Sequence, residues 1–136
     1  MVKTEIRVIY GDTDQMGVVY YANYLRYFEA GRNELLRAKG VVYRDFEREF
    51  QVSLPVVDAQ VSYSRPARYD DLLTIETALA KLGRASVRFE YRVLRGEELL
   101  VTGKSAAHRP GGVTWLVLAK SKVAGNVLRQ TGTHWR

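Results

Sequence analysis

One long stretch of helical periodicity lies near the start of this chain, and the segments around it have the patterns of strands. Between residues 21 and 39 apolar side chains recur every three or four positions, with Gly31 filling a gap on the same face. Gly40 follows as a stop signal for the helix. The apolar positions are Tyr21, Tyr24, Leu25, Phe28, Leu35 and Leu36. Because a helix with one broad apolar face must cover another apolar surface, this stretch predicts a helix that lies on a sheet.

Five segments have strand character: residues 3–10, 52–63, 72–82, 85–94 and 99–108. Pro55 indicates a bulge or an edge position in the second segment. Tight turns are predicted at residues 83–84 and 95–98, and one or two helical turns at residues 43–50. The order of strand, long helix and then a meander of antiparallel strands predicts an α+β fold with the helix on one face of the sheet.

The composition excludes several kinds of chemistry. The chain has 136 residues, which predicts one domain, and it contains no cysteine. Disulfides, thiolate nucleophiles and cysteine-bound metals are therefore excluded. Two isolated histidines, His108 and His134, do not have the spacing of a metal site, so no metal is expected. Because the first residues resemble a strand and no run is long enough to cross a membrane, we expect a cytoplasmic protein without membrane insertion.

The net charge of +6 comes entirely from the C-terminal quarter, since the 15 Lys/Arg and 15 Asp/Glu of residues 1–100 cancel. Residues 101–136 contain six Lys/Arg and no acid. Three interpretations remain open: a solvated tail, a surface for a phosphorylated ligand such as the nucleotide of CoA, or a weak nucleic-acid patch. The tail is favoured, and nucleic acid is disfavoured because no nucleic-acid motif accompanies the charge.

Residues 11–17 form a Gly- and Asp-rich turn between the first strand and the helix. Asp12 and Asp14 lie in this turn, which ends at Gly17. Such acids are common turn formers, so the turn alone does not establish chemistry. Its position places a carboxylate beside a helix N-terminus, where unpaired N–H groups and the helix dipole stabilise negative charge. These groups suffice for hydrolysis of an activated ester without serine, cysteine or metal.

Two segments resemble a known family. YGDTDQMGVVYYANYLRYFE, residues 10–29, is similar to the signature of the 4-hydroxybenzoyl-CoA thioesterase family, hotdog-fold acyl-CoA thioesterases that include a branch associated with the Tol–Pal envelope system. YSRPARYDDLL, residues 63–73, is similar to a later part of the family pattern, and the resemblance covers about residues 3–107. It implies a hotdog fold, in which a curved antiparallel sheet of five to six strands wraps a long central helix. A single domain over residues 1–136 is then expected, with residues 110–136 divergent and an extra strand at 113–118 as one reading.

The resemblance also implies roles for individual residues. It assigns the catalytic carboxylate to Asp14 and the carbonyl-polarising backbone N–H to Tyr21, where many relatives have histidine. It implies no cofactor, and an active site at the interface of a homodimer that often pairs into a tetramer. Asp12, Gly17 and Asn23 are expected to support the site, and Arg65, Arg68 and Arg84 are candidate contacts for the phosphates of CoA.

The function expected from this resemblance is hydrolysis of an acyl-CoA thioester to a carboxylic acid and CoA. Asp14 would act as general base or as nucleophile, and the sequence leaves both open. Two alternatives remain: a thioesterase for acyl groups on a carrier protein, which the basic tail would favour, and a non-catalytic acyl-binding protein. A hydratase is disfavoured, because hotdog hydratases typically pair an acid with a histidine and residues 10–29 contain none.

Overall fold

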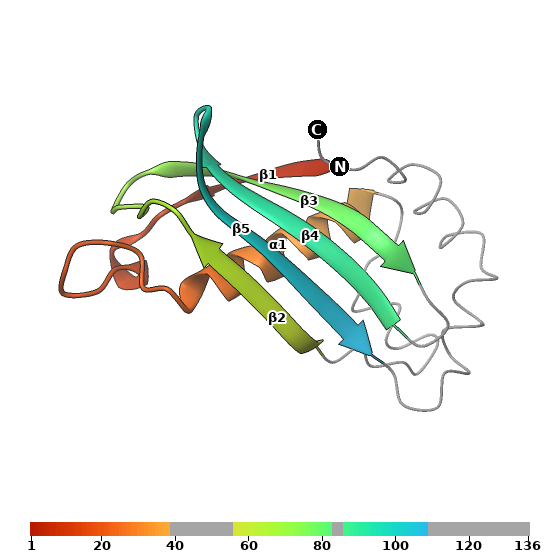
Figure 1. Ribbon diagram of the computed structural model, residues 1–136. Helices are drawn as coiled ribbons and strands as arrows, with labels where there is room; N and C mark the ends of the chain where they lie inside the picture. Colours follow the sequence, from red (N-terminus) through yellow and green to blue (C-terminus); the bar gives the residue numbers. More distant parts are fainter. Residues whose placement is uncertain (39–55, 83–85, 109–136) are drawn as a thin grey trace.

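The computed structural model describes residues 1–38, 56–82 and 86–108 (Figure 1). Its elements are β1 (Val2–Arg7), a short 3-10 helix η1 (Tyr10–Asp12), α1 (Asn23–Ala38), β2 (Val56–Tyr63), β3 (Leu72–Leu82), β4 (Ser86–Arg95) and β5 (Glu98–His108). The predicted helical turns at 43–50, the turn at 83–84 and residues 110–136 lie outside the described residues. So do Gly40, Arg84 and His134.

The five strands form one antiparallel sheet in the order β1-β3-β4-β5-β2. The predicted meander is confirmed for β3, β4 and β5, which pair in chain order. It is wrong for β2, which pairs with β5 and lies at the opposite edge from β1. The reason is the connection at residues 64–71: it is too long for a tight hairpin and pairs instead with the loop before α1, as Val19 N–H donates to the Ala67 carbonyl at 2.8 Å.

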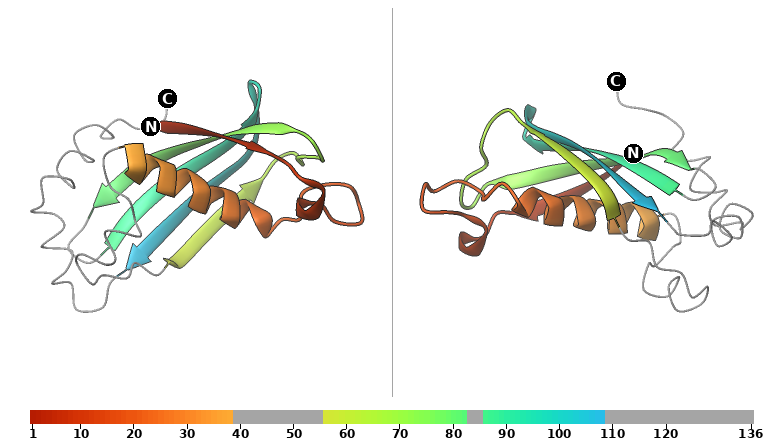
Figure 2. Two further views of the ribbon diagram at one scale, coloured as in Figure 1. Left: turned by 180° about the vertical axis from the view of Figure 1, so that it is seen from behind. Right: turned by 60° about the horizontal axis from the view of Figure 1, so that its bottom comes forward.

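Helix α1 lies along one face of the sheet and packs on β1, β3 and β4 (Figure 2). Its buried residues follow the predicted helical spacing and are Tyr24, Tyr27, Phe28, Gly31 and Leu35. Gly31 permits the close approach, because a Cβ atom there would lie 2.4 Å from Thr77 Oγ1. Gly103 of β5 makes the matching space for Phe28, whose ring stacks on Tyr91 with centroids 4.3 Å apart. The prediction of one helix on one face of an antiparallel sheet is confirmed.

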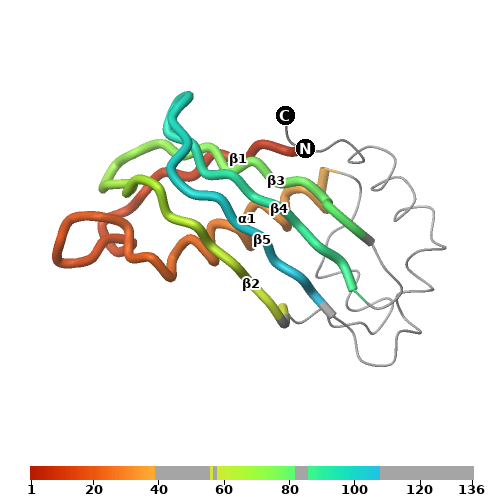
Figure 3. Tube along the Cα trace, in the orientation of Figure 1, coloured from red at the N-terminus to blue at the C-terminus, as the bar shows by residue number. Residues whose placement is uncertain are grey.

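Three connections gather at one end of the sheet (Figure 3): the loop from β1 to α1, the connection from β2 to β3, and the β4–β5 turn. Hydrogen bonds tie them together. Ser64 N–H donates to the Leu100 carbonyl at 2.8 Å, and Val8 N–H donates to the Asp71 carbonyl at 2.9 Å. The described residues among those expected at the site therefore lie at or near this end of the fold.

Candidate active site

The turn at residues 14–17 is ordered by the backbone and side chain of Asp14. Asp14 N–H donates to the Val18 carbonyl at 2.9 Å, and Gly17 N–H donates to the Asp14 carbonyl at 3.0 Å. Gly17 has φ +80°, a conformation that favours glycine. Met16 N–H donates to Asp14 Oδ1 at 2.8 Å. Among the described residues Asp14 Oδ2 has no hydrogen-bond partner, so one carboxylate oxygen holds the turn while the other is available for chemistry.

Asp12 differs from Asp14 in its contacts, because its carboxylate binds side chains of α1. It is 4% exposed, accepts a hydrogen bond from the Tyr27 hydroxyl at 2.8 Å, and forms an ion pair with Arg26. Burial, followed by the hydrogen bond to Asp12, raises the pKa of the Tyr27 hydroxyl well above its usual value. The carboxylates of Asp12 and Asp14 thus have separate partners. Asp12 fastens the loop to α1.

Asn23, the first residue of α1, completes this attachment. Its side-chain amide donates to the Asp12 carbonyl at 2.9 Å, and the same carbonyl accepts the Tyr20 N–H at 2.9 Å. The side chain of Asn23 therefore fixes the distance between the turn and the helix start.

The two residues before α1 carry free backbone donors. Asn23 N–H donates to the Tyr20 carbonyl at 2.9 Å, and Leu25 N–H donates to the Ala22 carbonyl at 3.2 Å. In the part of the chain that the structure describes, the N–H groups of Tyr21 and Ala22 have no such partner. Unpaired donors at a helix start favour negative charge, so this is where an oxyanion would be stabilised.

Tyrosine rings surround these donors. The Tyr20 and Tyr21 ring centroids are 4.5 Å apart, and Tyr63 meets Tyr21 edge-on at 6.4 Å. The pKa of the Tyr20 hydroxyl is raised, chiefly by its hydrogen bond with Tyr21 and by charge repulsion from Tyr21. The charge of Asp14 makes the smallest contribution. The Tyr21 side chain is 60% exposed, which leaves this cluster open to a ligand.

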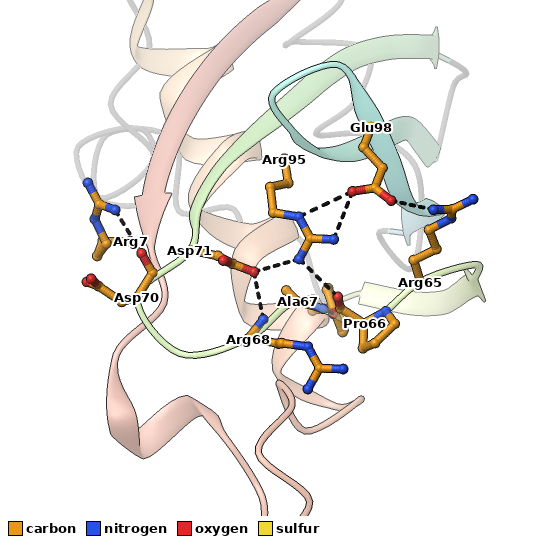
Figure 4. Close-up of polar contacts among 10 residues, drawn as sticks. Arg7, Arg65, Pro66, Ala67, Arg68, Asp70, Asp71, Arg95 and Glu98 are labelled. Atoms are coloured by element: carbon orange, nitrogen blue, oxygen red, sulfur yellow. Dashed lines mark hydrogen bonds and ion pairs between the residues drawn. The ribbon is translucent and has the colours of Figure 1, made fainter.

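On its other side the turn rests on residues 64–71, which a network of charges holds in place (Figure 4). Val18 forms a bridge with Arg68, and Arg68 N–H donates to Asp71 Oδ2 at 2.8 Å. Arg95 pairs with Asp71 at 2.8 Å and with Glu98 at 2.8 Å. Although burial opposes it, the hydrogen bonds from Arg68 N–H and Arg95 lower the pKa of Asp71. The Arg95 hydrogen bond likewise lowers the pKa of Glu98.

The three arginines singled out from the sequence differ in their surroundings. Arg65 pairs with Glu98 at 2.7 Å, so its charge is already partnered. The exposed guanidinium of Arg68 has no hydrogen bond or ion pair among the described residues and extends away from Arg95 (Figure 4). Arg84 lies outside the described residues. Arg68 is thus the better placed of the first two to meet an anionic group from solution.

Sequence reasoning missed Tyr63, Asp71 and Arg95 as parts of this assembly. Tyr63 and Asp71 belong to the second segment that carries the family resemblance, so a signal was present. Arg95 gave no signal, because its partners are brought to it only by folding. The described residues contain no group of three His, Cys, Asp or Glu side chains that could hold a metal. No helix among them is both long and apolar enough to span a bilayer.

Comparison with known proteins identifies the family. A family model described as the thioesterase-like superfamily matches residues 8–117. The acyl-CoA thioesterase YbgC of Haemophilus influenzae is 38% identical over 95 residues, which cover 70% of each chain. A putative acyl-CoA thioesterase of Bacillus subtilis, YneP, is 45% identical over 75 residues, or 55% of this chain and 54% of the relative.

Solved structures agree with this assignment. A probable thioesterase from Bartonella henselae has a TM-score of 0.75 and 37% identity, covering 79% of this chain and 89% of its own. A 4-hydroxybenzoyl-CoA thioesterase mutant complexed with 4-hydroxybenzoyl-CoA has a TM-score of 0.72 and 27% identity, covering 79% of this chain and 81% of its own. The single helix on a five-stranded antiparallel sheet is thus the predicted hotdog fold, and the chain belongs to the thioesterase-like superfamily.

Proposed function

We propose that this protein hydrolyses acyl-CoA thioesters to a carboxylic acid and CoA, with Asp14 and the start of α1 as the reactive site. One observation carries the proposal: in a member of the thioesterase-like superfamily, the Asp14 carboxylate lies in the loop that leads into a helix start, and among the described residues one of its oxygens and two backbone N–H groups at that helix start have no partner. Relatives named acyl-CoA thioesterase in Haemophilus influenzae, and acyl-CoA thioester hydrolase in Escherichia coli, support the substrate class.

The chemistry follows from these groups. Acting as general base, Asp14 takes a proton from water, and the resulting hydroxide attacks the thioester carbonyl carbon. The carbonyl π electrons move to oxygen, where the Tyr21 N–H and the helix dipole stabilise the oxyanion. Collapse of the tetrahedral intermediate breaks the C–S bond and releases the CoA thiolate, which is a good leaving group. Alternatively, Asp14 attacks the carbonyl carbon directly, the C–S bond breaks with loss of CoA thiolate, and water then hydrolyses the resulting mixed anhydride to release the acid and regenerate Asp14.

Substitution of the carboxylate tests the proposal. Asp14→Asn preserves the side-chain shape and the hydrogen bond from Met16 N–H, but it removes the base or nucleophile. Thiol release from short aliphatic, long aliphatic and benzoyl-type CoA esters should be seen for the wild type and lost in the variant. Asp70→Asn is the matched control, because Asp70 is exposed with φ 70°, a conformation that asparagine tolerates. Equal turnover by wild type and Asp14→Asn would refute the role of Asp14.

The surface around the site supports an assembly in which a second copy completes it. Met16 is 83% exposed, Leu25 46% and Tyr63 50%, and all three belong to or flank the elements of the site. Large exposed apolar side chains favour association, and homodimers are the commonest oligomers. We therefore propose a homodimer or a dimer of dimers. Light scattering at micromolar concentration tests this, and a monomer would contradict it.

A second candidate substrate is an acyl group on a carrier protein. The observation that favours it is the run of residues 101–136, which has six Lys/Arg and no acid and would attract an acidic partner. Rates for one acyl group presented on CoA and on a carrier protein discriminate between the two. A kcat/KM at least tenfold higher for the carrier-bound form, falling steeply with salt, would transfer the proposal to the carrier substrate. Binding of acyl-CoA without any turnover would instead indicate the non-catalytic reading.

A further inference from the structure

Tyr63 reaches the proposed oxyanion site from the far edge of the sheet. It is the last residue of β2, and its hydroxyl donates a hydrogen bond to the Tyr21 carbonyl oxygen at 3.0 Å. The same carbonyl accepts the Tyr24 N–H, but at 3.4 Å, which is at the limit of a hydrogen bond. The side chain of Tyr63 therefore provides the shorter restraint on this peptide group.

Because of the geometry of the peptide bond, the hydrogen bond from Tyr63 to the Tyr21 carbonyl also restrains the backbone N–H groups of Tyr21 and Ala22. The carbonyl of Tyr21 and the N–H of Ala22 belong to one planar trans peptide, so they point in opposite directions. Fixing the carbonyl fixes the direction of the Ala22 N–H. The Tyr21 N–H belongs to the preceding peptide group, so only the φ and ψ of Tyr21 then remain to orient it. A hydrogen bond to the carbonyl also polarises the peptide, which strengthens the Ala22 N–H as a donor.

Tyr63 is itself held firmly enough to act in this way. Its Cα pairs with Val101 in the sheet, and its ring packs edge-on against the buried Tyr24 with centroids 5.6 Å apart. Burial, and to a smaller extent Tyr21, raises the pKa of the Tyr63 hydroxyl. The hydroxyl consequently keeps its proton at neutral pH. It is therefore a hydrogen-bond donor at neutral pH.

We propose that Tyr63 is a positioning residue for thioester hydrolysis, which holds the Tyr21–Ala22 peptide so that the free N–H groups of Tyr21 and Ala22 face the developing oxyanion. This inference rests on the proposed function. In this role the hydroxyl acts through its hydrogen bond to the Tyr21 carbonyl and not on the substrate itself. It acts on the orientation and strength of the donors, and this contribution is greatest when the carbonyl oxygen becomes negatively charged.

The test is Tyr63→Phe, which removes one oxygen atom from a half-exposed side chain and keeps the ring contacts. We expect kcat to fall about tenfold while KM stays within about twofold, because the lost effect is specific to the transition state. Tyr69→Phe is the matched control. Tyr69 is 54% exposed against 50% for Tyr63, packs its ring on Tyr10, and makes no hydroxyl hydrogen bond among the described residues. Its kcat should equal that of the wild type.

A spectroscopic measurement separates positioning from a merely structural effect. In the Asp14→Asn background, infrared difference spectra of bound benzoyl-CoA report how strongly the donors polarise the thioester carbonyl. Adding Tyr63→Phe should shift this band toward its position in free benzoyl-CoA, with the melting temperature unchanged. Turnover by the wild type with an unaltered kcat in Tyr63→Phe would overturn the inference. The inference would also be overturned if Tyr63→Phe lost kcat because the protein unfolds while the carbonyl band of bound benzoyl-CoA does not shift. An inactive wild type would refute the proposed function instead.

Discussion

Gly103→Ala tests the packing that seats the helix on the sheet. A Cβ atom at this position would lie 2.3 Å from Phe28 Cε2, 2.4 Å from Phe28 Cζ and 3.2 Å from the Gln60 carbonyl oxygen. The Phe28 ring is 1% exposed and stacks on Tyr91 at 4.3 Å, so it has little room to move away. Overpacking of this kind costs about 1–3 kcal/mol. The lower entropy of the unfolded alanine chain offsets about 0.4–1 kcal/mol of that.

The expected net loss is therefore about 1–2 kcal/mol of unfolding free energy, or roughly 3–8 °C in melting temperature for a domain of this size. Urea unfolding and thermal melts should be recorded at one fixed protein concentration, because association also stabilises the fold. Gly11→Ala is the matched control, since no heavy atom lies within 4 Å of a Cβ atom there. Phe28→Leu combined with Gly103→Ala should show favourable coupling, because the smaller side chain makes room for the methyl group.

A melting temperature for Gly103→Ala equal to that of Gly11→Ala would refute this reasoning. It would mean that α1 can shift along or away from β5 at no cost. The helix start and its free donors would then not be held in register with the sheet, and the rigid placement of the proposed site would lose its physical basis.

Two further substitutions probe how the site is supported. Asp12→Ala leaves the buried Tyr27 hydroxyl without its acceptor and detaches the turn from α1. We therefore expect the free energy of unfolding in urea to fall by about 2–4 kcal/mol, and to fall much less for Tyr27→Phe. Arg95→Met removes the partner that lowers the pKa values of Asp71 and Glu98. Because these folded-state pKa values lie below the unfolded ones, the stabilisation is present at neutral pH and is lost as pH falls through the folded values. The stability difference between wild type and Arg95→Met should thus be larger at pH 7 than at pH 3, and an equal difference at both would contradict the charge network.

The sequence predicted the helix and the strand segments because each depends on local periodicity. The boundary at the helix start differed in an informative way: the helix was expected from residue 21 and begins at Asn23. Residues 21 and 22 continue the apolar pattern, but the side-chain amide of Asn23 binds the Asp12 carbonyl and fixes the point of entry. Periodicity cannot register this bond. Within the described part of the chain, the backbone N–H groups of the two residues before the helix have no partner.

Pro55 indicated a bulge or an edge position for the segment at residues 52–63, but the pairing of β2 with β5 and the partners of individual side chains could not be read from the sequence. Tyr63 and Tyr21 are 42 positions apart, and Arg65 meets Glu98 from 33 positions away. Such contacts depend on the crossover at residues 64–71, which local patterns do not encode. Asp12 was expected to support the site of Asp14, and the fold gives the two carboxylates separate partners.

The most direct test of the central claim is the ratio of kcat values for wild type and Asp14→Asn on the preferred acyl-CoA, measured by thiol release with both proteins checked for folding. General-base catalysis contributes about 10²- to 10⁴-fold, so we expect the variant to be slower by at least about 100-fold, with a KM close to that of the wild type. A folded Asp14→Asn protein that hydrolyses the acyl-CoA at a kcat within about threefold of the wild-type value would contradict the account. The reaction would then not depend on the Asp14 carboxylate, and the proposed base or nucleophile would be wrong.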